Sequence, residues 1–227
     1  MATASALVMT STSTSSTIAK HGCKDRCGNV SIPYPFGIGS SNCYYDKTFE
    51  ISCAGDSPNN SYPKIGKSYK VLQITLDYVR IDGWAPPNCY NNESGMGQWD
   101  YAKTFDDSLT NERPFTFSNT HNKLTAVGCD IFAYIPSKDS QNYSTGCASL
   151  CGNETMASNS SSSSSCFGRN GCCQTSIPKG LKNFELLIQS INTNNRSWIH
   201  NPCSYAFLVD NEYSGFESIH QGIHFFF

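Results

Sequence analysis

The chain has 227 residues, of which 38% are hydrophobic and 15% are charged, and its formal net charge is −2. This length suits one large domain or two small ones with a modest hydrophobic core. Because the overall charge is so small, no global electrostatic field can gather nucleic acid or an anionic membrane surface, and any site for a polyanion must be local.

Residues 1–22 form a leader that is rich in Ser and Thr and contains no acidic residue. Its apolar stretch is limited to residues 6–9, whereas a secretory signal peptide carries about 7–15 apolar residues. We therefore interpret the leader as a poor or truncated signal peptide.

From residue 23 onwards, short runs of alternating apolar and polar residues are separated by Gly, Pro and Asn, a pattern typical of strands and turns. The clearest run covers residues 70–81, where Leu72, Ile74, Leu76 and Tyr78 share one parity, so one half-buried strand is expected there. Other expected strands cover residues 49–53, 115–117, 125–131, 184–188 and 205–209. The sequence thus predicts an all-β fold of antiparallel sheets.

Residues 137–165 are polar and contain a run of serines, which favours a flexible connection. We expect two small cysteine-rich lobes with long loops, joined by this connection. The predicted parts are a cysteine-rich domain (23–136), a glycosylated loop (137–165), a second cysteine-rich lobe (166–210) and a tail (211–227). The tail is apolar at its end but too short to span a membrane.

Twelve cysteines dominate the chain: Cys23, Cys27, Cys43, Cys53, Cys89, Cys129, Cys147, Cys151, Cys166, Cys172, Cys173 and Cys203. Their spacing does not fit a zinc ribbon, and the five histidines are scattered, so we expect disulfides and no metal site. The adjacent Cys172 and Cys173 should have different partners, because a bond between neighbours is strained. Seven Asn-x-Ser/Thr sequons also indicate the secretory route: Asn29, Asn59, Asn92, Asn142, Asn153, Asn159 and Asn195.

Residues 27–39 read Cys-Gly-Asn-Val-Ser-Ile-Pro-Tyr-Pro-Phe-Gly-Ile-Gly, and Cys-Tyr-Tyr (43–45) and Phe-Glu-Ile-Ser-Cys (49–53) follow. Further motifs are Leu-Thr-Ala-Val-Gly-Cys (124–129), Asn-Tyr-Ser-Thr-Gly-Cys (142–147), Gly-Cys-Cys-Gln (171–174) and Asn-Pro-Cys-Ser-Tyr-Ala-Phe (201–207). Together they resemble the galacturonan-binding extracellular domain of plant wall-associated receptor kinases, over nearly all of residues 23–210.

The resemblance implies an extracellular module that contacts pectin, the polygalacturonate of the plant cell wall, or its oligogalacturonide fragments. In that family the domain precedes EGF-like repeats, a membrane span and a kinase, none of which is recognisable in this sequence. Kinase activity is therefore not expected of the chain. A secreted ectodomain, a relic of a receptor and an incomplete gene product all remain open as its origin.

A ligand that carries one carboxylate on each sugar calls for several cations, ideally beside aromatic rings. The best local candidate is the segment 64–80, which contains Lys64, Lys67, Lys70 and Arg80 against a single acid. Lys24 and Arg26 form a second candidate. Each exposed ion pair contributes only about 0.2–1 kcal/mol, so binding would need several contacts and would weaken in salt. A structural alternative is that Lys70 and Arg80 belong to the apolar face of their strand and only extend their charged ends to solvent at its two ends.

Aromatic residues near these cations form a further set of candidates for sugar contact: Tyr34, Phe36, Tyr44, Tyr45 and Trp84. Aromatic rings of this kind are more often part of a core. Three interpretations stay open for the acidic stretch of Glu93, Asp100, Asp106, Asp107 and Glu112, namely a solvated loop, a calcium contact shared with pectate, and a glycosidase pair. The solvated loop is favoured, so calcium would enter only with the ligand and no other cofactor is expected.

Sequence templates for catalysis are absent, including the nucleophile elbow, the zinc-protease helix and the phosphate-binding loop. We therefore expect a secreted binding protein that is not an enzyme, located outside the cell in the cell wall or on the outer face of the plasma membrane. The alternative is a secreted protein-interaction or decoy module on the same scaffold. Capture of a protein partner that survives pectinase treatment would favour this alternative.

Overall fold

The computed structural model describes residues 19–57, 60–66, 69–83, 85, 87–89, 101–104 (backbone only), 114–136, 145–151, 166, 171–182, 184–191, 202–211 and 223–227. These residues form sixteen strands and one short 3-10 helix, η1 (Lys47–Phe49), and contain no α-helix. The strands are β1 (Arg26–Cys27), β2 (Val30–Ser31), β3 (Gly37–Ile38), β4 (Glu50–Ala54), β5 (Tyr62–Ile65), β6 (Tyr69–Ile74), β7 (Val79–Gly83), β8 (Asn88–Cys89), β9 (Tyr101–Thr104), β10 (Asn122–Val127), β11 (Ile131–Ile135), β12 (Thr145–Ser149), β13 (Cys172–Ser176), β14 (Glu185–Ser190), β15 (Cys203–Asp210) and β16 (Ile223–Phe226). The predicted all-β, disulfide-rich fold is confirmed.

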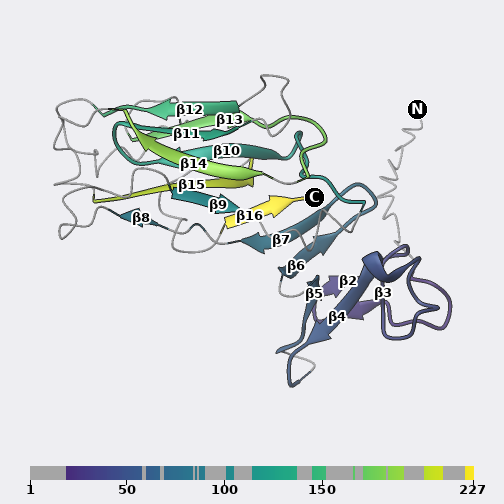
Figure 1. The fold of residues 1–227 in the computed structure, drawn as a ribbon. Helices are drawn as coiled ribbons and strands as arrows, with labels where there is room; N and C mark the ends of the chain where they lie inside the picture. The colour runs from purple at the N-terminus through teal and green to yellow at the C-terminus, as the bar shows by residue number, and fades with distance from the viewer. Residues whose placement is uncertain are drawn as a thin grey trace, which may run out of the picture.

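One sheet of six strands, in the order β16-β7-β6-β5-β4-β3, connects the two parts of the molecule. In Figure 1, β2–β5 belong to a small N-terminal part, whereas β7 and β16 lie against the larger body. β16 falls within the predicted tail, yet it pairs with β7, and Phe225 lies opposite Ile81. Phe225 is fully buried, so the end of this chain is part of the core.

The prediction of a single strand over residues 70–81 is wrong, because the chain turns between β6 and β7 and returns antiparallel. The hydroxyl of Thr75 accepts a hydrogen bond of 3.0 Å from the backbone N–H of Tyr78 and so holds the turn. Leu76 lies in this turn and is 73% exposed. A register shift within β6 places Val71 on the buried side together with Ile74, although the simple alternation predicted only Ile74 there.

Two other strand predictions differ from the structure. The run 125–131 is divided between β10 and β11, since Gly128 and Asp130 both have positive φ, which a continuing strand does not tolerate. Residues 115–117 form no strand, although the N–H of Phe117 donates to the carbonyl of Leu181. The runs 49–53, 184–188 and 205–209 are confirmed as β4, β14 and β15.

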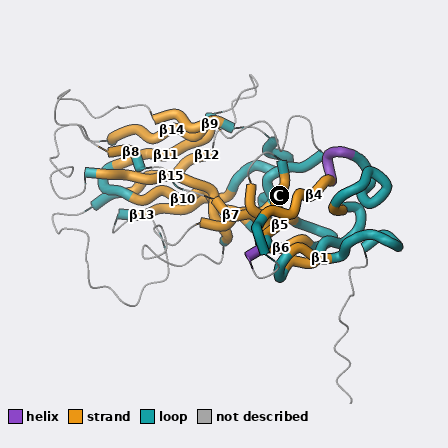
Figure 2. The backbone as a smooth tube through the Cα atoms, turned by 90° about the horizontal axis from the view of Figure 1, so that it is seen from below, coloured by secondary structure: helices purple, strands orange, loops and turns teal. Residues whose placement is uncertain are grey.

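The larger body consists of two antiparallel sheets of four strands, ordered β13-β10-β15-β8 and β12-β11-β14-β9. They share one hydrophobic core, to which Leu124 of β10 and Leu186 of β14 contribute fully buried side chains. Figure 2 shows β10 and β15 running side by side through this body. Phe207 and Val209 of β15 belong to a second cluster, so β15 is covered on both faces.

Strands pair across the division that the sequence predicted at residues 137–165. β10 pairs with β13 and β15, and β11 pairs with β14, so strands from residues 23–136 and from residues 166–210 share the same sheets. Residues 166–210 are therefore not a separate lobe. The physical reason is that antiparallel neighbours in these sheets are far apart in the sequence, where local patterning carries no information about them.

All twelve cysteines are paired, and none is free. The pairs are Cys23–Cys43, Cys27–Cys53, Cys89–Cys203, Cys129–Cys151, Cys147–Cys173 and Cys166–Cys172. The prediction that Cys172 and Cys173 have different partners is confirmed. The first two bonds lie in the N-terminal part and the other four in the larger body. The two cysteine-rich parts are thus joined by the shared six-stranded sheet and not by a disulfide.

Candidate functional site

The sheet formed by β4, β5 and β6 has one buried face and one exposed face. Ile51, Pro63 and Ile65 alternate into the core. On the opposite face, Lys64 pairs with Ser52 of β4 on one side and with Lys70 of β6 on the other. Tyr62 shares this face because it lies two residues before Lys64 on β5. We call the set Ser52, Tyr62, Lys64 and Lys70 the basic face.

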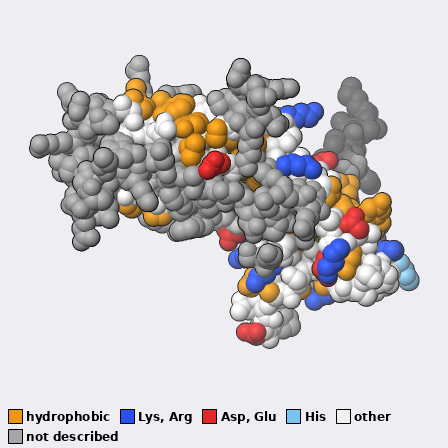
Figure 3. Space-filling model, viewed as in Figure 1, with side chains coloured by type: hydrophobic (Ala, Val, Ile, Leu, Met, Phe, Trp, Pro, Cys, Tyr) orange, Lys and Arg blue, Asp and Glu red, His pale blue; other side chains and the backbone are white. Residues whose placement is uncertain are grey.

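Both lysines of the basic face lie beside one aromatic ring. The ammonium nitrogens of Lys64 and Lys70 are 5.3 and 5.5 Å from the centre of the Tyr62 ring. Neither lysine has an ion-pair partner in the part of the chain that the structure describes. Like charges directly opposite one another on neighbouring strands destabilise a sheet, so an anion that binds here would relieve a repulsion. In Figure 3, several of the visible Lys and Arg side chains lie over the N-terminal part and the adjoining end of the larger body.

A second basic feature lies at the far end of the β4–β5 hairpin. It is an open pocket of about 500 Å³ lined by Lys24, Arg26, Gly28, Cys53, Gly55, Asp56, Ser57 and Ser61. Cys53 alternates with Ser52 along β4 and so points away from the basic face. We call this set the basic pocket. Lys24 and Arg26, the second basic candidate from the sequence, both line this pocket, and the hairpin end adds one carboxylate and two hydroxyls.

The guanidinium of Arg26 is fixed by its own hairpin. One nitrogen donates to Ser31 Oγ at 3.1 Å and the other donates to the carbonyl oxygen of Asn29 at 2.9 Å. The ammonium of Lys24 has a weaker contact, at 4.0 Å from Cys53 Sγ. Asn29 is the one sequon among the described residues and it is exposed beside the pocket residue Gly28, whereas the other six sequons lie outside them.

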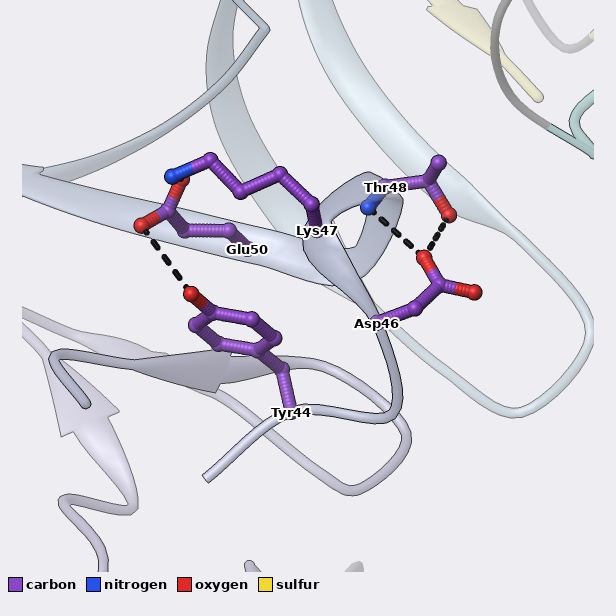
Figure 4. Close-up of polar contacts among 5 residues, drawn as sticks. All are labelled: Tyr44, Asp46, Lys47, Thr48 and Glu50. Carbon is purple, nitrogen blue, oxygen red and sulfur yellow. Dashed lines mark hydrogen bonds and ion pairs between the residues drawn. The ribbon is translucent and has the colours of Figure 1, made fainter. Parts of the chain in front are cut away.

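Of the aromatic candidates, Tyr44 has a structural role. Its side chain is buried, and its hydroxyl donates to Glu50 Oε1 at 3.5 Å (Figure 4). Glu50 also forms an ion pair of 2.6 Å with Lys47. Asp46 caps η1 by accepting a hydrogen bond of 2.7 Å from the backbone N–H of Thr48. The face of the Tyr44 ring is therefore not available to a sugar.

Tyr34 and Tyr45 remain accessible, with 40% and 68% of their surface exposed. The backbone N–H of Tyr45 donates to the carbonyl of Pro35, which brings the two loops together. Phe36 is buried and packs against Phe49. The two tyrosines thus lie near one another, but neither of them lines the basic pocket.

Arg80 is separated from the lysines with which the sequence grouped it. Its guanidinium lies 3.3 Å from the carboxylate of Asp210 on β15 and stacks over the ring of Phe226 at 5.5 Å. These contacts hold β7 and β16 against the larger body. The positive charge of Arg80 is already partly neutralised by Asp210. Lys67, the remaining member of that group, and Trp84 lie outside the described residues.

His224 of β16 lies next to this ion pair and opposite Asp82. Burial, and after it the positive charge of Arg80, lowers the pKa of His224, while Asp82 and Asp210 act in the opposite direction. Its buried Nδ1 has no hydrogen-bond partner among the described residues. The neutral form of His224 is therefore the one that suits the folded chain.

Other predicted features are limited by what the structure describes. The acidic stretch from Glu93 to Glu112 lies outside the described residues. Within them, no group of three His, Cys, Asp or Glu side chains could hold a metal ion. The same residues contain no helix of the length and apolarity that crossing a bilayer requires.

Comparison with known proteins relates these features to a family. Residues 23–82 match the family described as wall-associated receptor kinase galacturonan-binding. The basic face and the basic pocket both lie within the matched residues, and so do the disulfides Cys23–Cys43 and Cys27–Cys53.

Several proteins to which this chain is similar are wall-associated receptor kinases of Arabidopsis thaliana. Wall-associated receptor kinase 5 is 34% identical over 203 residues, kinase 1 is 33% identical over 211 residues, and kinase 2 is 31% identical over 200 residues. Each match covers 86–87% of this chain but 25% of the relative. The chain thus spans about a quarter of the length of these relatives. No solved structure matches it.

Several residues that the sequence analysis did not predict belong to the candidate sites, among them Ser52, Tyr62, Asp56, Ser57 and Ser61. A signal for Tyr62 was present, because it precedes Lys64 by two residues on an alternating strand. Asp56, Ser57 and Ser61 had no signal of their own, since they reach Lys24 and Arg26 only through the folding of the β4–β5 hairpin onto β1.

Proposed function

We propose that this chain is an extracellular pectin-binding module and that the basic face is its contact with de-esterified polygalacturonate. The observation that supports this proposal is the arrangement of Lys64 and Lys70, which lie opposite one another on neighbouring strands with both ammonium groups beside the Tyr62 ring. The family match supports the ligand class. The six disulfides support a location outside the cytosol.

The chemistry of the basic face fits a polymer of uronic acids. Each ammonium group can donate hydrogen bonds to one carboxylate of the polymer, and the phenol ring offers an apolar surface to a sugar ring. Each exposed contact contributes about 0.2–1 kcal/mol, so affinity must come from several sugars on one polymer. The proposed module acts by binding and carries out no reaction.

Retention on immobilised polygalacturonate tests this proposal. We expect the secreted, oxidised protein to be retained at low salt and released as the salt concentration rises. The double variant Lys64→Gln, Lys70→Gln should bind about 2- to 30-fold more weakly.

The matched control is Lys179→Gln, Lys182→Gln, which removes the same charge from exposed lysines outside the basic face and the basic pocket. It should elute with the unchanged protein. If the two double variants elute together, the basic face is not the contact, and if the unchanged protein is not retained, the proposed function is wrong.

A further inference from the structure

The basic pocket is physically separate from the basic face. The two features use residues that alternate along β4, so they lie on opposite sides of the same hairpin. A single polymer segment lying along the basic face would therefore not need to enter the pocket. The pocket consequently calls for an explanation of its own.

Its lining combines two kinds of polar group. Lys24 and Arg26 provide positive charge, whereas Asp56, Ser57 and Ser61 provide a carboxylate and two hydroxyls, which can accept hydrogen bonds from hydroxyl groups. A ligand that satisfies both kinds carries one carboxylate and several hydroxyls. A fully ionised phosphate carries more negative charge beside Asp56 than a carboxylate does and has no hydroxyl to donate to it, whereas a neutral sugar brings no anion to the two cations.

We infer that the basic pocket is a subsite for a single uronic acid residue, with its carboxylate toward Lys24 and Arg26 and its hydroxyls toward Asp56, Ser57 and Ser61. This inference rests on the proposed function for its choice of sugar acid. The pocket gives the domain a site for short fragments, in addition to the face that follows a long chain.

The pocket is formed before any ligand arrives. Arg26 is oriented by Ser31 Oγ and the carbonyl of Asn29, so its guanidinium loses little freedom on binding. The disulfide Cys27–Cys53 joins β1 to β4 beside the pocket. Gly28, at φ 56°, allows a close approach to the hairpin, since a Cβ there would collide with the carbonyl oxygen of Ser61.

Calorimetric titration of the secreted protein with digalacturonate tests the inference, and galactose serves as the neutral control. Saturable binding of digalacturonate is expected, together with no binding of galactose. Lys24→Gln should weaken digalacturonate binding about two- to fivefold, and Arg26→Lys, which keeps the charge but loses the forked geometry, should weaken it as well. Lys179→Gln removes the same charge outside the pocket and should leave this binding unchanged.

Retention on polygalacturonate is measured with the same proteins, so that the two proposals can fail separately. The variant Lys64→Gln, Lys70→Gln should be retained more weakly on the polymer and keep digalacturonate binding. If digalacturonate does not bind, or if Lys24→Gln and Lys179→Gln bind it equally, the pocket is not a uronate subsite, whatever the polymer shows. Retention without digalacturonate binding overturns this inference alone.

Discussion

Lys64 and Lys70 lie directly opposite one another on β5 and β6, with both ammonium groups beside the ring of Tyr62. Two like charges in this position lower the stability of the free protein, and the Tyr62 ring offsets part of that cost. The same two positive charges would attract the carboxylates of an anionic polymer. Stability and ligand binding should therefore respond in opposite directions to a change at this pair.

The substitution Lys70→Glu tests that opposition. It replaces a repulsive cross-strand pair with an attractive one, so the free energy of unfolding should rise by about 0.2–1 kcal/mol. Retention on polygalacturonate should be lost, because a carboxylate now faces the ligand. Denaturant unfolding and the retention assay measure the two effects. A variant that is both less stable and unable to bind would show that the pair is structural.

Tyr62 should contribute to binding through its ring and not through its hydroxyl. Tyr62→Ala removes the surface beside Lys64 and Lys70, and we expect polygalacturonate binding to weaken by about 0.5–1 kcal/mol. Tyr62→Phe keeps the ring and should bind normally. Tyr45→Ala is the matched control, since Tyr45 is more exposed but lies outside the basic face. Equal losses for Tyr62→Ala and Tyr45→Ala would argue against a specific role for Tyr62.

The sequence predicted which charged residues would belong to the candidate site, but not how they are arranged. Lys64 and Lys70 were grouped with Arg80 by local charge alone, and local charge does not report a turn between them. The turn held by Thr75 reverses the chain, and Arg80 then meets Asp210, which lies 130 residues away. No local pattern reports such a contact.

The fold class followed from the sequence because alternation and cysteine content are local properties. The partners of the strands and cysteines are not local: Cys89 bonds Cys203 across 114 residues, and β10 lies between β13 and β15. The basic pocket has the same origin, since Lys24 meets Ser61 only when β1 packs against the β4–β5 hairpin. Its cations were predictable, but its hydroxyls and its shape were not.

A glycan on Asn29 should restrict the basic pocket. Asn29 is exposed and follows the pocket residue Gly28, so a glycan attached to it lies beside Arg26. We expect Asn29→Gln to bind digalacturonate more tightly than the glycosylated protein, as measured by calorimetry.

The control for this prediction is Ser31→Ala, which also abolishes the sequon but removes a hydrogen-bond partner of Arg26. It should bind digalacturonate more weakly than Asn29→Gln, because the guanidinium is less well oriented. Identical binding by the glycosylated protein and Asn29→Gln would show that the glycan does not reach the pocket.

The disulfide Cys27–Cys53 should have two effects: it should stabilise the N-terminal part and maintain the shape of the basic pocket. It closes a loop with a sequence separation of 26, for which removal costs about 3 kcal/mol. The double variant Cys27→Ser, Cys53→Ser should lose that free energy of unfolding and also bind digalacturonate more weakly. Loss of stability with unchanged digalacturonate affinity would contradict a pocket that depends on this bond.

His224 should make the attachment of β16 sensitive to acid. Its pKa is lowered in the folded chain by burial and by Arg80, so folding favours the neutral imidazole. The stabilisation is complete above the unfolded pKa of about 6.5 and is lost as the pH falls from there toward the lower folded value.

Unfolding temperatures measured at about pH 7.5 and pH 5.5 lie on either side of the pH at which this loss of stability begins. The unchanged protein should lose more stability across that interval than His224→Gln does. His21→Gln is the control, because His21 is exposed, and it should behave like the unchanged protein. If His224→Gln shows the same loss on acidification, His224 does not set the acid sensitivity of this strand.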